Sequence, residues 1–504
     1  MIMQGPILSI LMGLPLLAGI VMLRLTPTAA YRVGLAICLV SLVLVGGLYH
    51  QFDFTTADFQ FTEQHAWFPA LDIHYMVGID GIALPLIILT TMLTPLVLIG
   101  ARPKVKRFTE YAAAFLMLQG LMVGVFCALD SVLFYLCFEG LLIPMFLIIG
   151  IWGGPNRIYA TLKFFIFTFL GSIFLLVALL YLHSVAQANL LPQTFAIQTF
   201  WQVPLTLMQQ KWLFFAFLFA FGVKIPMVPV HTWLPDAHVE APTGGSVILA
   251  AVLLKMGAYG MLRFMLPITT DAARNFDMVV IALSLAAIVY IALVALLQKD
   301  MKKLIAYSSI AHMGFVTLGL FVPYTLMHNG EEAGILWGLQ GAYVQLISHG
   351  FISAALFFSV GMLYDRLHSR WIKDYGGLAK TMPLFATFFV FFALANCGVP
   401  GTSGFVGEFF VILSALQAHF SWALIAATTL LFGAGYSLWM VKRVIFGAPQ
   451  GPVLTLPDLT RRELLILGVL GVAVLGIGVY PQMLLEMSEA SLLQLGEQMA
   501  QAKG

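Results

Sequence analysis

Charged residues are scarce in this chain. Asp, Glu, Lys and Arg make up 10% of the 504 residues, whereas 61% are hydrophobic and the mean hydropathy is +0.96. Soluble proteins carry about 25% charged residues, and a water-soluble fold of this composition would expose apolar patches that aggregate. The net charge is only +2, which argues against a nucleic-acid partner. The composition predicts a protein whose solvent is the lipid bilayer.

Motifs for cofactor chemistry are missing as well. The four cysteines, Cys38, Cys127, Cys137 and Cys397, form no C-x-x-C pair, so disulfide, zinc and iron–sulfur frameworks have no support. No lysine directly follows a glycine, which excludes a P-loop, and neither a G-x-S-x-G elbow nor an H-E-x-x-H pair occurs. We therefore expect no nucleotide, flavin or metal cofactor in this chain.

Long apolar runs dominate the sequence instead. A run of about 20 residues is long enough to cross a bilayer as a helix, and fourteen such spans are predicted. They lie at residues 3–23, 33–49, 77–100, 111–129, 131–152, 164–184, 212–235, 244–266, 278–297, 304–323, 335–363, 383–417, 421–445 and 463–481. No Lys or Arg precedes the first run, so we do not expect it to be a cleavable signal peptide.

Basic residues fall mainly in every second loop between these spans. The exceptions in the opposite loops and the tail are Lys211, Arg263, Arg274 and Lys503. Because basic loops face the cytoplasm, both termini are predicted to lie on the outer side of a bacterial inner membrane. One segment, 236–243, should face the cytoplasm, yet it carries Asp236 and Glu240 and no Lys or Arg.

Six ionisable side chains fall deep inside the predicted spans, where charge is expensive and usually functional. They are Glu139, Lys224, Lys255, His312, His349 and Glu408. A purely structural interpretation pairs Glu139 with Lys224 and treats the histidines as core residues. Small residues and hydroxyls pack membrane helices at lower cost, so we favour a polar axis through the protein. Asp80 and Asp130 are weaker candidates because each lies near a span end.

Proline interrupts two of the spans. Pro226 and Pro229 closely follow Lys224 in the seventh span, and Pro400 lies eight residues before Glu408 in the twelfth. Proline cannot donate to the helical hydrogen-bond ladder. Broken backbone at membrane depth is tolerated only where it lines a cavity or is buried in protein. Both breaks therefore lie beside candidate functional residues.

The two breaks are five spans apart, and this spacing predicts two five-helix repeats that cross the membrane in opposite orientations. The repeats would comprise residues 111–266 and 267–445. Residues 1–110 would supply helices 1–3, and residues 446–504 a loop, helix 14 and the tail. The expected fold class is an all-α polytopic membrane protein of about 14 helices, with helices 7 and 12 broken.

Three segments carry a resemblance to a known family. They read FGVKIPMVPVHTWLPDAHVEAPTGGSVILAAVLLKMGAYGMLRF, KKLIAYSSIAHMGFV and GVPGTSGFVGEF. The chain resembles the proton-conducting antiporter-like subunits of respiratory complex I, of the chain M type. Subunits of cation/proton antiporters and of membrane hydrogenases share much of the long central motif.

The resemblance implies a role for each of the six candidate residues. Glu139 matches the glutamate of the fifth span, Lys224 its partner lysine, and Lys255 the central lysine. His312 and His349 match the histidines of the hydrophilic axis. Glu408 matches the exit residue, which is glutamate in chain M and lysine in chains L and N.

The same resemblance implies the setting of the chain. It would translocate protons while NADH, FMN, iron–sulfur clusters and quinone are bound by other subunits. Its partners would be membrane subunits of the L and N types and, through them, the NADH-oxidising arm. Two alternatives stay open: a component of a sodium/proton antiporter or hydrogenase, and a structural scaffold in the membrane.

Overall fold

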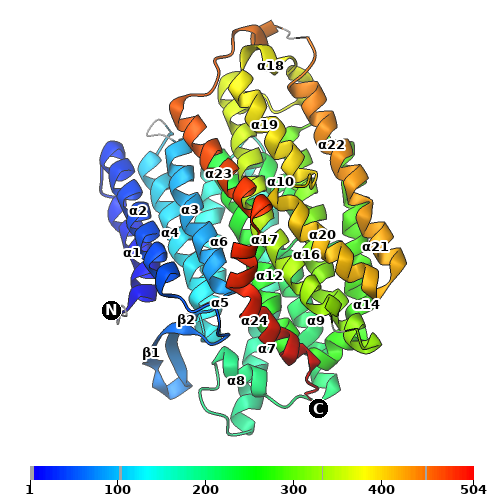
Figure 1. Cartoon of the computed structure of the whole chain (residues 1–504). Coiled ribbons are helices and arrows are strands. Elements are labelled where there is room, and N and C mark those ends of the chain that lie inside the picture. The colour runs from blue at the N-terminus through cyan, green and yellow to red at the C-terminus, as the bar shows by residue number, and fades with distance from the viewer. Residues whose placement is uncertain (1–4, 102–104, 332, 449–450, 504) are drawn as a thin grey trace.

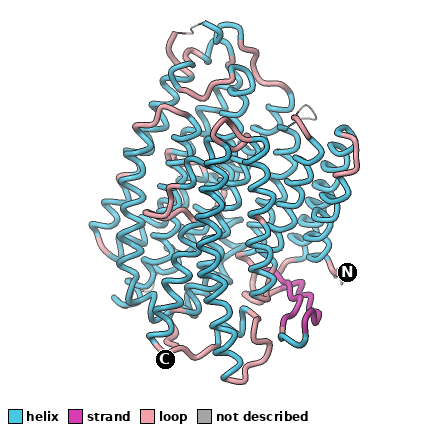
Figure 2. The backbone as a smooth tube through the Cα atoms, turned by 180° about the vertical axis from the view of Figure 1, so that it is seen from behind, coloured by secondary structure: helices cyan, strands magenta, loops and turns pink. Residues whose placement is uncertain are grey.

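The computed structural model describes residues 5–101, 105–331, 333–448 and 451–503. Within them the chain is a bundle of helices with one two-stranded antiparallel sheet (Figures 1 and 2). Eleven of the described helices are long and apolar enough to cross a membrane, and three shorter apolar helices accompany them. The predicted all-α polytopic class is confirmed, while the count of fourteen crossings and the inverted repeats stay predictions.

The elements follow one another along the chain in four groups. Residues 7–101 form α1 (Ile7–Met22), α2 (Pro27–Gln51), β1 (Gln60–Phe68), the 3-10 turn η1 (Pro69–Leu71), β2 (Ile73–Ile79) and α3 (Ala83–Ala101). Residues 108–268 form α4 (Phe108–Cys127), α5 (Ser131–Gly140), α6 (Leu142–Trp152), α7 (Arg157–Ala188), α8 (Ile197–Gln202), α9 (Leu207–Lys224), α10 (Trp233–Glu240), α11 (Thr243–Ile248), the π turn η2 (Leu249–Leu253), α12 (Leu254–Gly260), the π turn η3 (Met261–Met265) and α13 (Leu266–Ile268). Residues 270–444 form α14 (Thr270–Ala286), the π turn η4 (Ala287–Ile291), α15 (Ala292–Leu296), α16 (Met301–Asn329), α17 (Ala333–Leu367), the 3-10 turn η5 (Ile372–Asp374), α18 (Leu378–Thr381), α19 (Pro383–Asn396), α20 (Ser403–Ala418), α21 (Phe420–Ala427) and α22 (Thr429–Val444). The last group is the 3-10 turn η6 (Gly451–Thr455), α23 (Arg461–Val479) and α24 (Gln482–Ala500).

Both predicted breaks are present. The seventh run is divided into α9, which ends at Lys224, and α10, which begins at Trp233. The twelfth is divided into α19, which ends at Asn396, and α20, which begins at Ser403. The indole of Trp233 donates to the carbonyl of Val223 (3.0 Å), so part of the backbone at the first break finds a partner inside the protein.

The helices at the centre of the bundle are shielded from lipid. In the most apolar 18-residue stretch of each helix, the share of residues that are buried falls from the centre to the rim. This share is 100% in residues 243–268 and in α17 and 94% in α16, but 33% in α23 at the rim. Lys255, His349 and His312 lie on these three central segments. These three ionisable residues are thus carried by helices that other helices surround.

The elements that the sequence did not predict include a hairpin and a C-terminal helix. The hairpin β1–β2 follows the second run and its strand β2 overlaps the start of the third, and α24 closely follows α23. Helix α24 is amphipathic and packs against α17 and α13. The hydroxyl of its Ser491 also accepts a hydrogen bond from the amide of Gly81, just before α3 (3.1 Å). Hairpin, α8 and both termini lie toward the lower end of Figure 1, opposite α18.

Candidate functional site

The centre of the site is Lys255, a fully buried lysine on α12. The π turns η2 and η3 flank its helix, and such widened turns are frequent at functional sites. Lys255 Nζ donates to the carbonyl of Ala250 in η2 (2.9 Å) and lies 2.7 Å from Nδ1 of His349 on α17. A buried amine thus contacts a buried imidazole with which it can exchange a proton.

The line continues from His349 to Glu408. The ring centroids of His349 and His312 are 5.7 Å apart, and His312 Nδ1 lies 2.8 Å from Glu408 Oε1 on α20. The amide of Gln345 donates to the same carboxylate oxygen (3.2 Å), and the Tyr436 hydroxyl lies 3.5 Å from His312 Nε2. Four predicted residues therefore form one buried polar line across four segments of the bundle.

The break between α19 and α20 is built around Glu408. Gly398 and Gly401 have φ angles of +70° and +89°, which residues with a Cβ rarely adopt. A Cβ at Gly398 would lie 3.0 Å from Glu408 Oε2. The glycines of GVPGTSGFVGEF thus let the chain turn tightly over the carboxylate.

In the part of the chain that the structure describes, Glu139 and Lys224 make no hydrogen bond to this line, and the two do not form an ion pair with each other. Lys224 is 3% exposed and its Nζ lies 4.4 Å from the ring centroid of Phe138, a favourable cation–π contact. Glu139 Oε1 is buried without a hydrogen-bond partner among the described residues, although the two charges act on each other. The structural interpretation of a fixed ion pair is therefore wrong for this conformation.

His238 is a central residue that the sequence analysis missed. It lies on α10, directly after the first break, is fully buried, and stacks on Phe357 of α17 at a centroid distance of 4.5 Å. Neither ring nitrogen has a hydrogen-bond partner among the described residues, and the charges of Lys255 and Lys302 both act on it. The sequence places His238 in the loop 236–243 and therefore does not predict that it is buried. The break in the helix just before this segment could have indicated a buried functional residue.

Lys302 was counted among the loop lysines, but the structure buries it. Only 6% of the residue is exposed, and its Nζ donates to the carbonyl of Ala241 (2.7 Å) and lies 3.4 Å from the Ser246 hydroxyl. Ser246 in turn donates to the carbonyl of His238 (3.0 Å). Lys302 and His238 thus extend the polar interior from Lys255 toward the end of the bundle that carries the basic loops.

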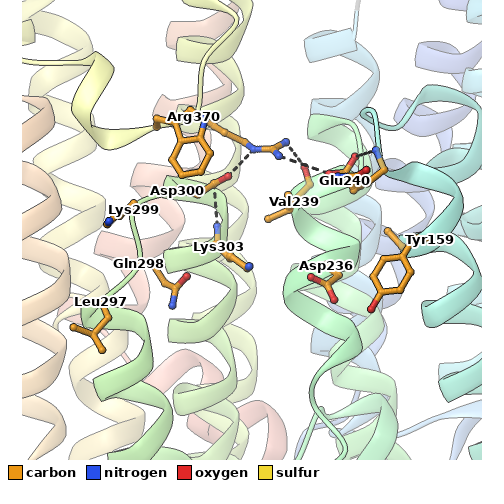
Figure 3. A pocket seen from close by; sticks show the side chains of 13 residues that line it. Tyr159, Asp236, Val239, Glu240, Leu297, Gln298, Lys299, Asp300, Lys303 and Arg370 are labelled. Carbon is orange, nitrogen blue, oxygen red and sulfur yellow. Dashed lines mark hydrogen bonds and ion pairs between the residues drawn. The ribbon is translucent and has the colours of Figure 1, made fainter.

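Residues 236–243 are acidic, although the charge pattern predicts that they face the cytoplasm. Their acids pair with basic side chains at this end of the bundle (Figure 3). Lys163 binds Asp236 at 2.7 Å, while Arg370 lies 3.6 Å from Glu240 and 2.5 Å from Asp300. Asp236, Glu240, Asp300 and Arg370 line a cavity of about 530 Å³. The two acids of the segment are therefore neutralised by basic residues of neighbouring segments. Its lack of Lys and Arg thus no longer conflicts with the predicted cytoplasmic position.

A second buried charge pair joins Asp80 and Arg263. Arg263, which was expected in an outer loop, is 4% exposed in η3, and its guanidinium binds the carboxylate of Asp80. Asp80 also accepts from the amides of Ile82 and Ala83. Because each charge satisfies the other away from water, this pair joins η3 to the residues just before α3. The other weak candidate, Asp130, caps α5.

Two family models match the sequence. The model described as NADH:quinone oxidoreductase/Mrp antiporter, TM, matches residues 128–433. The model described as NADH-ubiquinone oxidoreductase chain 4, amino terminus, matches residues 10–128. The first of these alone spans more than half of the chain.

Two solved structures share the fold. A chain of respiratory complex I from Thermus thermophilus with bound NADH superposes with a TM-score of 0.88 and 26% identity, covering 98% of this chain and 99% of that one. A chain of the Mrp complex from Dietzia sp. has a TM-score of 0.82 and 19% identity, with 97% of each chain covered. The second likeness is one of fold alone.

Curated relatives match over nearly the whole length. NADH-quinone oxidoreductase subunit M of Rhodobacter capsulatus is 48% identical over 467 residues, which are 91% of this chain and 88% of the relative. NADH-ubiquinone oxidoreductase chain 4 of Marchantia polymorpha is 43% identical over 495 residues, which are 97% and 96% of the two chains. This chain belongs to the family of NADH-quinone oxidoreductase subunit M and NADH-ubiquinone oxidoreductase chain 4.

Proposed function

We propose that this chain is a proton-translocating membrane subunit of an NADH:quinone oxidoreductase and that its path runs through Lys255, His349, His312 and Glu408. The observation that carries this proposal is the buried polar line itself. Lys255 lies 2.7 Å from His349, and His312 lies 2.8 Å from Glu408. All four are side chains that can take up and release a proton.

Glu139 and Lys224 act as a switch beside this line. Removal from water favours the neutral amine, while an approaching carboxylate favours the ammonium ion. When Glu139 pairs with Lys224, the lysine holds its proton; when the pair opens, the lysine releases it toward Lys255. The separated arrangement, with Lys224 over Phe138, supports an open state of this switch.

The proton then leaves at Glu408. Lys255 passes a proton to His349, which it already contacts, a water molecule carries it across the 5.7 Å between the ring centroids of His349 and His312, and His312 passes it to the Glu408 carboxylate. Glu408 discharges toward the outer side, the side on which both termini are proposed to lie. Each step transfers one proton between neighbouring bases and leaves the donor ready to be reloaded from the cytoplasm through Lys302 and His238.

Electron transfer takes place elsewhere in the complex. NADH, FMN, iron–sulfur clusters and quinone are bound by other subunits, and the neighbours in the bacterial inner membrane are subunits of the L and N types. No group of three or more His, Cys, Asp or Glu residues suited to a metal ion occurs among the described residues. The work that we propose for this chain is proton transfer.

A role in a cation/proton antiporter is the second candidate, and the matching family model, whose description also names the Mrp antiporter, favours it. Purification in mild detergent separates the two. We expect the chain to co-purify with flavin and iron–sulfur subunits and to support proton uptake driven by NADH in inverted vesicles. Sodium/proton exchange without any redox partner would instead establish the antiporter.

Glu408 should require an exchangeable proton rather than a particular shape. We expect Glu408→Asp to keep most proton pumping, Glu408→Lys to keep part of it, and Glu408→Gln to lower it about tenfold, because an amide cannot carry a proton between neighbours. Pumping is measured in vesicles at matched assembly. Full activity of the Gln variant, which can still hydrogen bond to His312, would remove Glu408 from the path.

A further inference from the structure

A second cavity at the basic end of the bundle has a different chemistry from that in Figure 3. It measures about 690 Å³ and lies where the end of α22 meets η5 and the segment after α15. Backbone hydrogen bonds fix its walls: the amide of Ile372 donates to Lys299 (3.0 Å) and that of Gly377 to Phe446 (3.1 Å). The cavity is thus framed by three segments that are held together.

Its charge is of one sign. The lining side chains with a full charge are Lys299, Lys373, Lys442 and Arg443. No ion pair of these four is present among the described residues, and no Asp or Glu lines the cavity. Lys299 and Trp371 also line the neighbouring cavity of Figure 3, where acids are present and Arg370 is paired with Asp300 and Glu240. We call the unpaired set the cationic cavity.

Exposed apolar side chains surround the cationic cavity. Trp371 and Phe446, which line it, are 46% and 52% exposed, and Leu297 at the end of α15 is 78% exposed. On α22, Leu438 and Trp439 are exposed as well, and the Arg443 guanidinium lies 4.5 Å from the Trp439 ring centroid. Aromatic and basic residues gather in this way at the level of lipid headgroups.

We propose that the cationic cavity binds the phosphodiester headgroup of an anionic phospholipid, of the phosphatidylglycerol or cardiolipin class. The four cations supply the charge that a phosphate requires, and basic pockets between helices on the cytoplasmic side are suited to such headgroups. The acyl chains lie against the exposed apolar side chains of α15 and α22. A soluble anion would leave these apolar side chains without a partner, so a lipid fits the surface better.

The test uses the intact membrane complex that contains this chain. The complex is stripped of lipid with detergent and incubated with phosphatidylglycerol, cardiolipin or phosphatidylcholine, and the lipid retained is quantified by mass spectrometry. The variant replaces all four cations: Lys299→Gln, Lys373→Gln, Lys442→Gln and Arg443→Gln. The matched control removes four exposed charges outside the cavity: Arg24→Gln, Arg32→Gln, Lys380→Gln and Arg461→Gln.

We expect the four-cation variant to retain about one anionic lipid less per complex than wild type and the control to retain as much as wild type. Equal retention by the variant, binding of phosphatidylcholine as strong as that of the anionic lipids, or displacement by inorganic phosphate would overturn the proposal.

A second experiment does not depend on the assembly of the variant. A photo-crosslinking residue placed at Phe446 in the otherwise wild-type complex should attach to phospholipid. Attachment to a neighbouring protein subunit instead would show that the cationic cavity is a protein interface, and the lipid proposal would be wrong.

Discussion

Replacing Lys224 with Met, or Glu139 with Gln, should lower NADH-driven proton pumping and the coupled quinone reduction about tenfold or more, a loss of roughly 1.4 kcal/mol or more in the rate-limiting step. Either change removes one partner of the switch, so the other can no longer be moved between two charge states. Pumping in vesicles and the level of assembled complex are measured together. Full coupled activity of Glu139→Gln in an assembled complex would contradict the switch.

Two further variants test whether the loss is specific. Lys211 lies on α9 as well, and its Nζ lies 5.9 Å from the ring centroid of Phe276, so Lys211→Met removes a lysine from the same helix away from the break and should stay active. Lys224→Arg keeps the charge, but arginine does not release its proton at an accessible pH. We expect this variant to assemble and to pump poorly.

Lys255→Met should abolish pumping at least as completely. Methionine fills most of the space of the buried lysine but leaves Ala250 and His349 without their common partner, and it cannot hold a proton. Lys255→Arg distinguishes a carrier from a structural charge: a carrier role predicts loss of pumping, whereas a structural role predicts near-normal activity. The exposed Lys380 on α18 provides the control, since Lys380→Met should pump as wild type does.

The sequence predicts the helices and their breaks well because the bilayer leaves a chain few choices. A backbone without water must satisfy its hydrogen bonds within each segment, so apolar length alone predicts a helix. The same constraint makes a mid-membrane lysine such as Lys255 or an acid such as Glu408 conspicuous. Both turned out to lie in the interior of the bundle rather than against lipid.

What the sequence does not predict is partnership over long separations. Asp80 and Arg263 are 183 residues apart, and nothing local to either position indicates the pair. Lys302 lies at the edge of an apolar run and therefore looks like a loop residue, while the short helix α10 that carries His238 has charged residues typical of a loop. Only packing decides that these side chains are buried.

The gap between His312 and His349 has a consequence for the resting membrane. Their ring centroids are 5.7 Å apart, and no hydrogen bond joins the two rings in the described part of the chain. A membrane potential of about 100 mV drives each charge across the membrane with roughly 2.3 kcal/mol. An unbroken chain of hydrogen bonds would let protons flow back and discharge this potential. On the proposed path a proton cannot pass directly from one ring to the other, so the step between His349 and His312 would limit the flow of protons back across the resting membrane.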